Sequence, residues 1–490
     1  MLRYRPGPYQ AVVGVALLAL VLSACAAPDL LDDPDAGRTL GFDPDALVFD
    51  LDARALLADS VAGLEALVAI APHSLVFEET DAGTQEVRYQ LAVAVRASDT
   101  GVLVREEVWT DTLRAPDAAT ARALPPVLHE SRWALPPGTY LVEARLDDLG
   151  TQREGTRRLR LVVPSEGDGP LLGRLRVEVQ RAERWVPHLG RTLAATDEAL
   201  RVRIAARSVM LDGASATGAP MEAVLRVERL PSDTTVARPP HWLGPSRGSL
   251  AYQGVRMGAA DTVFTSAPQP VEGRADLAFE LPPLGPGLYR LHVVLAAGTP
   301  ATTDASATGA TPTSDAALIE TERYLSVFAP GFPRLDTLDD LVETLAYIAY
   351  ERELDFIRAG PTLDERRARF DGFWGTLIGD RRVAANLLRL YYERIEEANQ
   401  RFSTVKPGWQ TDRGLLYVLL GPPGYVQPEL DGETWLYGNG LRQDAAAFRF
   451  RQATDFGQPP GWRPYLLDRQ AAYEGVWATY VGRWRRGRVR

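Results

Sequence analysis

The chain has 490 residues, of which 46% are hydrophobic, and its formal net charge is −10. This length predicts about three domains, and the apolar fraction is typical of a globular protein with packed cores. The mildly acidic balance argues against nucleic-acid binding, which needs a basic surface. The last ten residues are locally basic, and we interpret them as a solvated tail.

The first 25 residues have the pattern of a secretion signal. Arg3 and Arg5 precede the apolar run AVVGVALLALVL, which is too short for a membrane-spanning helix of about 20 residues. Cys25 ends this segment and is the only cysteine, which excludes intramolecular disulfides and thiol catalysis. The ending Leu-Ser-Ala-Cys resembles the lipobox of bacterial lipoproteins, in which the cysteine is acylated and the chain is cut before it. The resemblance implies a signal peptide over 1–24 and a lipid, such as palmitate, on Cys25.

The residue after Cys25 indicates a destination. It is Ala26 rather than Asp, which in lipoproteins of two-membrane bacteria implies export to the outer membrane. We therefore expect a chain that is anchored through acylated Cys25 and faces the periplasm, with residues 25–45 as a flexible tether. The alternative is an ordinary secretion signal with a chance cysteine.

Residues 46–165 have the period-two pattern of β-strands. The stretch RYQLAVAVRA places Tyr89, Leu91, Val93 and Val95 on one face of a strand. Turn residues separate several such stretches, and no helical pattern interrupts them. These features predict a first antiparallel β-sandwich domain.

An internal repeat predicts a second sandwich over residues 172–330. LPPGTYLVEARL at 135–146 matches LGPGLYRLHVVL at 284–295, and another strand pattern follows each copy. The low-complexity stretch at about 296–317 falls between the two strands of the second copy. We interpret it as a disordered insertion in a hairpin connection, where added length costs little.

Residues 334–490 change to helical periodicity. Helix-start signals stand at Thr337 and Thr362, and a third helical pattern covers 381–402. Three strands are then predicted, namely GLLYVLLG (414–421), ETWLYG (433–438) and AAFRFRQ (446–452). Because both faces of GLLYVLLG are apolar, we expect that strand to be covered on both sides. Three helices before a small antiparallel sheet predict an α+β domain, so the whole chain is expected to be multidomain.

The segment Gly408-Trp409-Gln410-Thr411-Asp412 stands between the third helix and this sheet. It resembles the signature of the GWxTD domain family of bacterial envelope proteins. The resemblance extends to Arg413-Gly414, to the exit Gly421-Pro422-Pro423, and to "PHSLVF" and "LPPGTY" in the first sandwich. The family implies no established activity.

Each residue of this segment has a structural interpretation. A glycine suits the turn, Trp409 can close a small core, and Asp412 can accept backbone N–H groups or pair with an arginine. The alternative is a recognition loop formed by Trp409, Thr411, Asp412 and Arg413. Catalysis by this segment is a third possibility.

The residues indicate no particular enzyme class. A GxSxG match at 244–248 lacks the strand and helix that a nucleophile elbow needs. The five histidines have no metal-ligand spacing, and no Gly-Lys pair exists for a nucleotide-binding loop. We therefore predict no catalytic residue, cofactor or metal.

These observations predict a non-catalytic outer-membrane lipoprotein that binds or scaffolds within the cell envelope, with an envelope protein as partner. One alternative is an envelope hydrolase that acts on glycan or peptide through carboxylates of the C-terminal domain. Another is a carbohydrate-binding module that uses the tryptophans near the C-terminus to stack on a glycan.

Overall fold

The computed structural model describes residues 42–57, 62–165, 169–196, 198–208, 221–232, 235–243, 260–297, 317–438, 446–452 and 464–489. The predicted signal peptide, Cys25, the GxSxG match and nearly all of the predicted insertion lie outside the described residues. The chain divides into two units, Met1–Leu30 and Leu31–Arg490, and every described residue belongs to the second.

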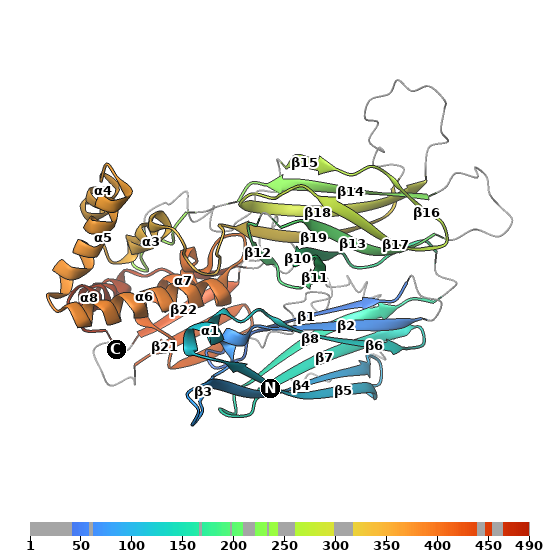
Figure 1. The fold of residues 1–490 in the computed structure, drawn as a ribbon, viewed down its shortest axis with the longest axis horizontal. Helices are drawn as coiled ribbons and strands as arrows, with labels where there is room; N and C mark the ends of the chain where they lie inside the picture. The colour runs from blue at the N-terminus through green and yellow to red at the C-terminus, as the bar shows by residue number, and fades with distance from the viewer. Residues whose placement is uncertain are drawn as a thin grey trace, which may run out of the picture. The chain divides into compact units, whose positions relative to one another are not determined.

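Two antiparallel sheets form the first sandwich (Figure 1), and their inner faces share one hydrophobic core. Tyr89, Leu91, Val93 and Val95 are all buried in this core, which confirms the predicted face. One sheet has the order β1-β2-β6, from strands β1 (Phe49–Ala55), β2 (Gly63–Ile70) and β6 (Val127–Ala134). In the other sheet β4 pairs with β3, β5 and β7, and β7 pairs with β8; its strands are β3 (Glu78–Glu79), β4 (Gln85–Ala97), β5 (Leu103–Ala115), β7 (Gly138–Asp148) and β8 (Glu154–Val163).

Two further sheets share a second hydrophobic core. Their pairs are antiparallel except for β12 with β19. The first sheet has the order β11-β10-β13-β17, with β9 on β13, from β9 (Leu171–Leu172), β10 (Arg176–Arg181), β11 (Arg184–His188), β13 (Leu200–Arg207) and β17 (Arg274–Leu281). The second has the order β12-β19-β18-β14-β15, with β16 on β14, from β12 (Thr192–Ala194), β14 (Met221–Leu230), β15 (Asp261–Thr265), β16 (Gln269–Val271), β18 (Gly287–Ala297) and β19 (Ala317–Phe328).

The internal repeat is a repeat of structure. Strands β7 and β8 pair antiparallel, and so do β18 and β19, which lie on either side of the low-complexity stretch. In each copy a tyrosine at the strand start donates a 2.8 Å hydrogen bond to the carbonyl oxygen four residues upstream. Tyr140 bonds Pro136 in the first copy, and Tyr289 bonds Gly285 in the second. This bond fixes the entry into the strand, so the two copies share their local geometry.

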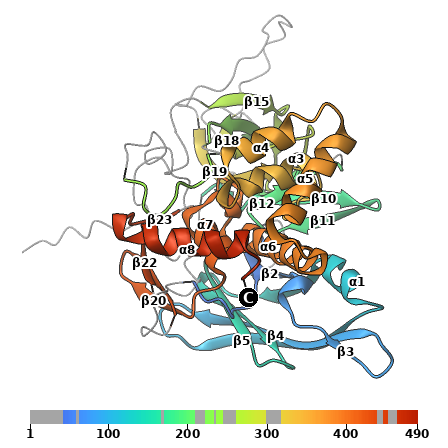
Figure 2. The same ribbon diagram turned by 90° about the vertical axis from the view of Figure 1, so that its left-hand side faces the viewer.

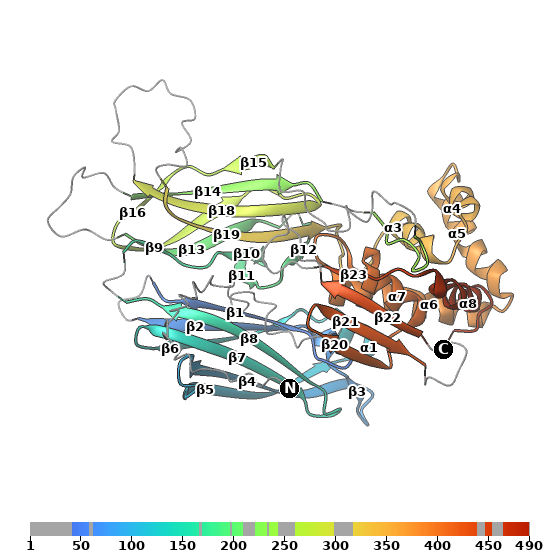
Figure 3. The same ribbon diagram turned by 180° about the vertical axis from the view of Figure 1, so that it is seen from behind.

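The C-terminal part of the chain has helices followed by a four-stranded antiparallel sheet, as the sequence predicts. Figure 2 shows α6 with α7 and α8, and Figure 3 shows the sheet in the order β20-β21-β22-β23. The elements are α3 (Leu338–Thr344), α4 (Glu351–Arg358), α5 (Leu363–Ile378), α6 (Arg381–Phe402), α7 (Asp412–Leu420), α8 (Glu474–Arg485), β20 (Tyr425–Glu429), β21 (Gly432–Tyr437), β22 (Ala446–Gln452) and β23 (Tyr465–Leu467).

Side-chain caps explain where three of these helices start. The Thr337 hydroxyl accepts from the N–H of Asp340 at 3.1 Å, and the Thr362 hydroxyl from Glu365 at 3.2 Å. At the start of α6 the carboxylate of Asp380 accepts two backbone N–H groups. Each cap satisfies donors that the first helical turn leaves free. The helix predicted over 381–402 is therefore confirmed to the residue.

Three local predictions are wrong. GLLYVLLG is not a strand but most of helix α7, and its residues 414–419 are all buried. A helix that is apolar all round is a buried helix, so burial on every side does not distinguish it from a covered strand. The first sandwich does contain a short helix, α1 (Ala118–Ala123), capped by Asp117. Helices α4 and α8 were also missed, so the C-terminal part has more than three helices.

A buried carboxylate links the two β-rich regions. Glu65 on β2 is fully buried and pairs with Arg54, Arg132 and Arg176, the last of which lies on β10. Burial by itself raises the pKa of Glu65, but the hydrogen bond from Arg54 and the charge of Arg176 outweigh it and lower the pKa to about 2.

Among the described helices, none has the length and apolar character needed to cross a membrane.

Candidate functional site

The GWxTD segment connects helices α6 and α7 through a short 3₁₀ turn, Gly408–Gln410. Gly408 lies so close to α6 that a Cβ atom there would stand 1.9 Å from the carbonyl oxygen of Ala398. Gly414, in the first turn of α7, would place a Cβ atom 1.9 Å from the carbonyl oxygen of Gly408. The two glycines therefore allow the turn to pack directly between the helix backbones.

Trp409 belongs to the hydrophobic core rather than to the surface. Its side chain is buried, and its ring lies 5.8 Å from that of Tyr347. The backbone N–H donates to Asn399 Oδ1 at 3.2 Å, and the carbonyl accepts from the Tyr347 hydroxyl at 2.5 Å. The turn is thus held from two sides by polar side chains of other elements.

Thr411 is the N-cap of α7. Its hydroxyl accepts from the N–H of Gly414 at 3.0 Å and donates to the carbonyl of Gly408 at 2.7 Å. Both hydrogen-bonding roles of the hydroxyl are therefore used inside the segment. The Thr411 side chain therefore caps the start of α7, which was predicted as a strand.

Asp412 is the most completely enclosed polar residue of the segment, with 2% of its surface exposed. Its carboxylate accepts two hydrogen bonds from Arg469, at 2.7 and 3.0 Å, and one from the N–H of Leu467 at 2.8 Å. The same guanidinium also donates to the carbonyl of Arg238 at 3.0 Å. This bidentate pair ties α7 to strand β23 and to the segment that follows β14.

Arg413 is packed between aromatic rings. Its guanidinium carbon lies 4.1 Å from the ring centre of Tyr465 and 5.0 Å from that of Phe402. Its Nη1 is 3.5 Å from Glu433 Oε1, and Glu433 is fully buried. The charge of Arg413 is therefore directed into the domain.

All four residues of the predicted recognition loop thus make internal contacts. Trp409, Thr411 and Asp412 are buried, and Arg413 is mostly covered. The structure brings these residues together as one joint between α6, α7 and β23. Their use in recognition stays a prediction, and their burial is the observation that weighs against it.

Several partners in this joint were missed in the sequence. Arg469 and Glu433 lie far along the chain and carry no local signal for their role. Lys406 donates from Nζ to the carbonyl of Thr235 at 2.9 Å, and Ala237 donates from its N–H to the carbonyl of Gln410 at 3.1 Å. Residues 235–243, which follow β14, therefore pack with this domain.

The C-terminal end of α7 is also held by side chains of other elements. Gly421 has a φ of +86°, and the buried Arg394 donates to the carbonyl of Val418 at 3.2 Å. The indole of Trp484 donates to the carbonyl of Leu419 at 2.9 Å, and the hydroxyl of Tyr437 donates to the carbonyl of Gly421 at 3.0 Å. These side chains satisfy carbonyls that the helix end leaves free. Burial lowers the pKa of Arg394.

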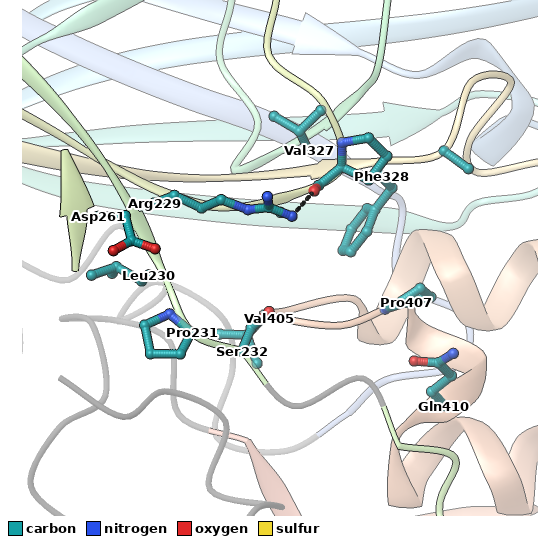
Figure 4. A pocket seen from close by; sticks show the side chains of 13 residues that line it. Arg229, Leu230, Pro231, Ser232, Asp261, Val327, Phe328, Val405, Pro407 and Gln410 are labelled. Atoms are coloured by element: carbon teal, nitrogen blue, oxygen red, sulfur yellow. Dashed lines mark hydrogen bonds between the residues drawn. The ribbon is translucent and has the colours of Figure 1, made fainter. Parts of the chain in front are cut away.

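A cavity of about 490 Å³ lies beside the GWxTD segment. Figure 4 shows Arg229 and Asp261 on one side of it, and Pro407 and Gln410 on the other. Arg229 donates to the carbonyl of Pro286 at 2.8 Å. Gln410 is 6% exposed, and its side-chain oxygen has no hydrogen-bond partner among the described residues. Its walls mix polar and apolar groups, and among the described lining residues only Arg229 and Asp261 are charged, so the cavity offers a concave surface and no cluster of acid and base groups.

The tryptophans of the C-terminal part lie mainly in the core. Trp374, Trp435 and Trp484 are buried, and Trp477 is half-buried, with its ring 6.1 Å from that of His241. Trp462 lies outside the described residues. Stacking on a glycan needs an exposed ring face, which the buried rings of Trp374, Trp435 and Trp484 do not offer.

The histidines give no sign of a metal site. Partial desolvation and the charges of Arg334 and Arg401 lower the pKa of His73, although the residue is exposed at the surface. Burial and the charge of Arg323 lower that of His188 to about 4. In the part of the chain that the structure describes, no three His, Cys, Asp or Glu residues form a group that could hold a metal ion.

Comparison with known proteins identifies a domain and no activity. The family model of the GWxTD domain matches residues 313–486, so the chain contains a GWxTD domain. No curated protein matches the chain. Among solved structures, the crystal structure of red sea bream transglutaminase is similar, with 10% identity and a TM-score of 0.16. That similarity covers 57% of this chain and 31% of the transglutaminase, and it supports no conclusion about fold or function.

Proposed function

We propose that this protein is a lipid-anchored component of the bacterial outer membrane that binds or scaffolds within the envelope and performs no chemistry of its own. The lipid anchor is supported by the charged start, the short apolar run and Cys25. The GWxTD domain supports an envelope location only through the resemblance of its family. The membrane itself would be one partner, through acylated Cys25, and an envelope protein the other.

One observation supports the absence of catalysis. The side chains of the GWxTD segment are engaged by other residues of the same domain. The Asp412 carboxylate, the obvious acid in the segment, is occupied by Arg469 and by a backbone N–H. A general base must reach a proton on a substrate, and this carboxylate is enclosed. The segment therefore acts as a joint that holds a binding surface in shape.

The cavity beside this joint is the described surface best suited to a partner. Its rim carries Arg229 and Asp261 from neighbouring strands, and its floor carries Gln410. A rigid concave surface with few polar groups favours recognition of a partner side chain or a small ligand.

Capture from native membranes tests this proposal. We expect the wild-type protein to retain a discrete envelope protein that Arg229→Glu loses. The matched control is Arg114→Glu, also an exposed arginine on a strand, which pairs with Glu86. Equal capture by both variants and the wild type would exclude the cavity as the binding surface.

Further measurements test the lipid anchor and the two alternative functions. Mass spectrometry of the membrane-extracted protein should show an acylated Cys25, and Cys25→Ser should move the protein into the soluble fraction. Release of product from envelope glycan or peptide, abolished by a single Asp or Glu substitution, would replace the proposal with a hydrolase. Binding of glycan without turnover would replace it with a carbohydrate-binding module.

A further inference from the structure

Gln410 brings an unused hydrogen-bond acceptor to the cavity beside the GWxTD segment. The residue lines the cavity and is 6% exposed, and Figure 4 shows it across the cavity from Arg229. Its side-chain oxygen is buried and has no donor in the part of the chain that the structure describes. Buried acceptors are nearly always satisfied, and an exception calls for a group that completes them. The oxygen therefore marks a place for a donor that comes from outside the described chain.

The backbone of Gln410 is fixed, so the residue cannot leave the cavity wall. Its N–H donates to the carbonyl of Pro407 at 3.0 Å, and its carbonyl accepts from the N–H of Ala237 at 3.1 Å. On either side of it, Trp409 is buried in the core and Thr411 caps α7. The fold thus keeps the side chain at the cavity although its acceptor is unused.

Much of the remaining wall suits an apolar body. Leu230 and Val405 belong to one buried hydrophobic cluster, and Phe328 is buried as well. All three line the cavity, together with Pro407. The volume of about 490 Å³ lies within the range of small-molecule pockets, so a large side chain can enter.

The charged residues of the lining favour an occupant without net charge. Arg229 and Asp261 stand opposite each other in the register of β14 and β15, and among the described lining residues only these two are charged. An occupant with a charge would meet a like charge as well as an opposite one. It would also lose its water inside the cavity, which is costly. The donor that Gln410 requires should therefore belong to a neutral group.

These conditions select among the side chains of a protein partner. Serine and threonine would leave most of the cavity empty, leucine and phenylalanine have no donor, and lysine and arginine bring a charge. An asparagine or glutamine would bury a second donor and an acceptor of its own. Tryptophan and tyrosine combine a large apolar body with a single polar group at the tip, and both are frequent anchors at interfaces.

We infer that the cavity receives one tryptophan or tyrosine side chain of the partner, whose N–H or O–H is donated to Gln410 Oε1. The inference rests on the proposed function, which places a partner at this cavity, and it specifies the group that the partner inserts. Because the oxygen is covered in the free chain, the amide turns towards the cavity as the donor enters. The last torsion of a glutamine side chain is soft enough for this turn.

Fluorine NMR titration of the full-length protein tests the inference with three small probes. The first is the N-acetyl amide of a fluorotryptophan, the second is the same compound methylated on the indole nitrogen, and the third is the N-acetyl amide of a fluorophenylalanine. Only the first carries a side-chain donor. We expect it to bind about fivefold more tightly than either of the others, which corresponds to one neutral hydrogen bond. Equal binding of the two tryptophan probes, or no binding of the first probe to the folded protein, would overturn the inference.

A variant assigns the difference between the probes to Gln410. Gln410→Met keeps the length of the side chain and removes the acceptor, so the two tryptophan probes should bind it equally. Its unfolding midpoint should equal or exceed that of the wild type, because a buried acceptor without a donor is removed. The matched control is Gln427→Met, an exposed glutamine on β20, which should keep the full difference. A difference that persists in folded Gln410→Met would assign the contact to another acceptor and overturn the inference.

Capture with Arg229→Glu distinguishes this inference from the proposed function. A partner that is captured through the cavity, without preference for the tryptophan probe that carries a donor, would overturn the inference alone. Preference for that probe without capture of any envelope protein would overturn the proposed function and keep the contact with Gln410.

Discussion

Asp412 and Arg469 are 57 residues apart in the chain, yet they form a buried bidentate ion pair with hydrogen bonds of 2.7 and 3.0 Å. The aspartate is the last letter of the GWxTD signature, and the arginine follows strand β23. This relationship gives the signature a physical role. It holds the start of α7 against the last strand of the sheet and against the segment that follows β14.

Removal of one member of this pair should be strongly destabilising. We expect Asp412→Asn to lower the free energy of unfolding by about 3–5 kcal/mol, because it leaves the mostly covered guanidinium of Arg469 without the charge of Asp412. Denaturant unfolding followed by tryptophan fluorescence measures the loss. Glu86→Gln, which breaks the exposed pair with Arg114, should cost less than about 1 kcal/mol. Similar small losses in both variants would contradict the structural role of the pair.

The two glycines of the joint should not tolerate a methyl group. Gly408→Ala would place its Cβ atom 1.9 Å from the carbonyl oxygen of Ala398, so a helix backbone must move. We expect a large fall in the unfolding midpoint, or no folded protein. Gly372 within α5 has open space around the same position, so Gly372→Ala should stabilise by about 0.5–1 kcal/mol. Circular dichroism during heating distinguishes the two, and a wild-type midpoint for Gly408→Ala would contradict the packing.

Phe42→Ala should weaken the GWxTD domain although the residue precedes the first strand. The substitution removes a half-buried ring from the cluster with Phe402 and Trp435. The expected loss is about 3 kcal/mol, the lower end for a phenylalanine in a core. Urea unfolding measures it, with Phe356→Ala as the matched exposed control. Equal midpoints for the two variants would show that the N-terminal segment does not support the domain.

Glu65 should contribute stability that depends on pH. The hydrogen bond from Arg54 and the charge of Arg176 outweigh burial and lower its pKa from 4.5 in the unfolded chain to about 2 in the folded chain. The folded state therefore favours the ionised form. This contribution, at most about 3 kcal/mol, is fully present above pH 4.5 and is lost as the pH falls towards 2.

Glu65→Gln isolates this contribution from the other carboxylates. We expect the variant to have a lower free energy of unfolding than the wild type at pH 7. The difference between the two proteins should shrink steadily below pH 4.5. Urea midpoints at a series of pH values between 7 and 2.5 measure it. A gap that stays constant over this range would exclude the ionisation of Glu65 as its source.

Much of the architecture could be read from the sequence because its signals are local. Alternating apolar residues predicted the buried face of β4, and the Asp380 cap lies within three residues of the start of α6. The Tyr140 and Tyr289 bonds span four residues each, so a sequence repeat was enough to predict a repeated hairpin. Thr411 caps the start of α7 and Gly421 ends it, so the signals for this helix were local too, but the strand prediction did not use them.

The sequence by itself determined the β-rich and helical regions, most element types and the GWxTD segment, since these depend on spacing and caps within a few residues. Only the tertiary structure decided which distant groups meet. It pairs Arg469 with Asp412 and Arg176 with Glu65, and it brings the N–H of Phe42 to the carboxylate of Glu433. Such pairs depend on the path of the whole chain, because a buried charge takes whichever partner the packing brings within reach, and no local pattern encodes that choice.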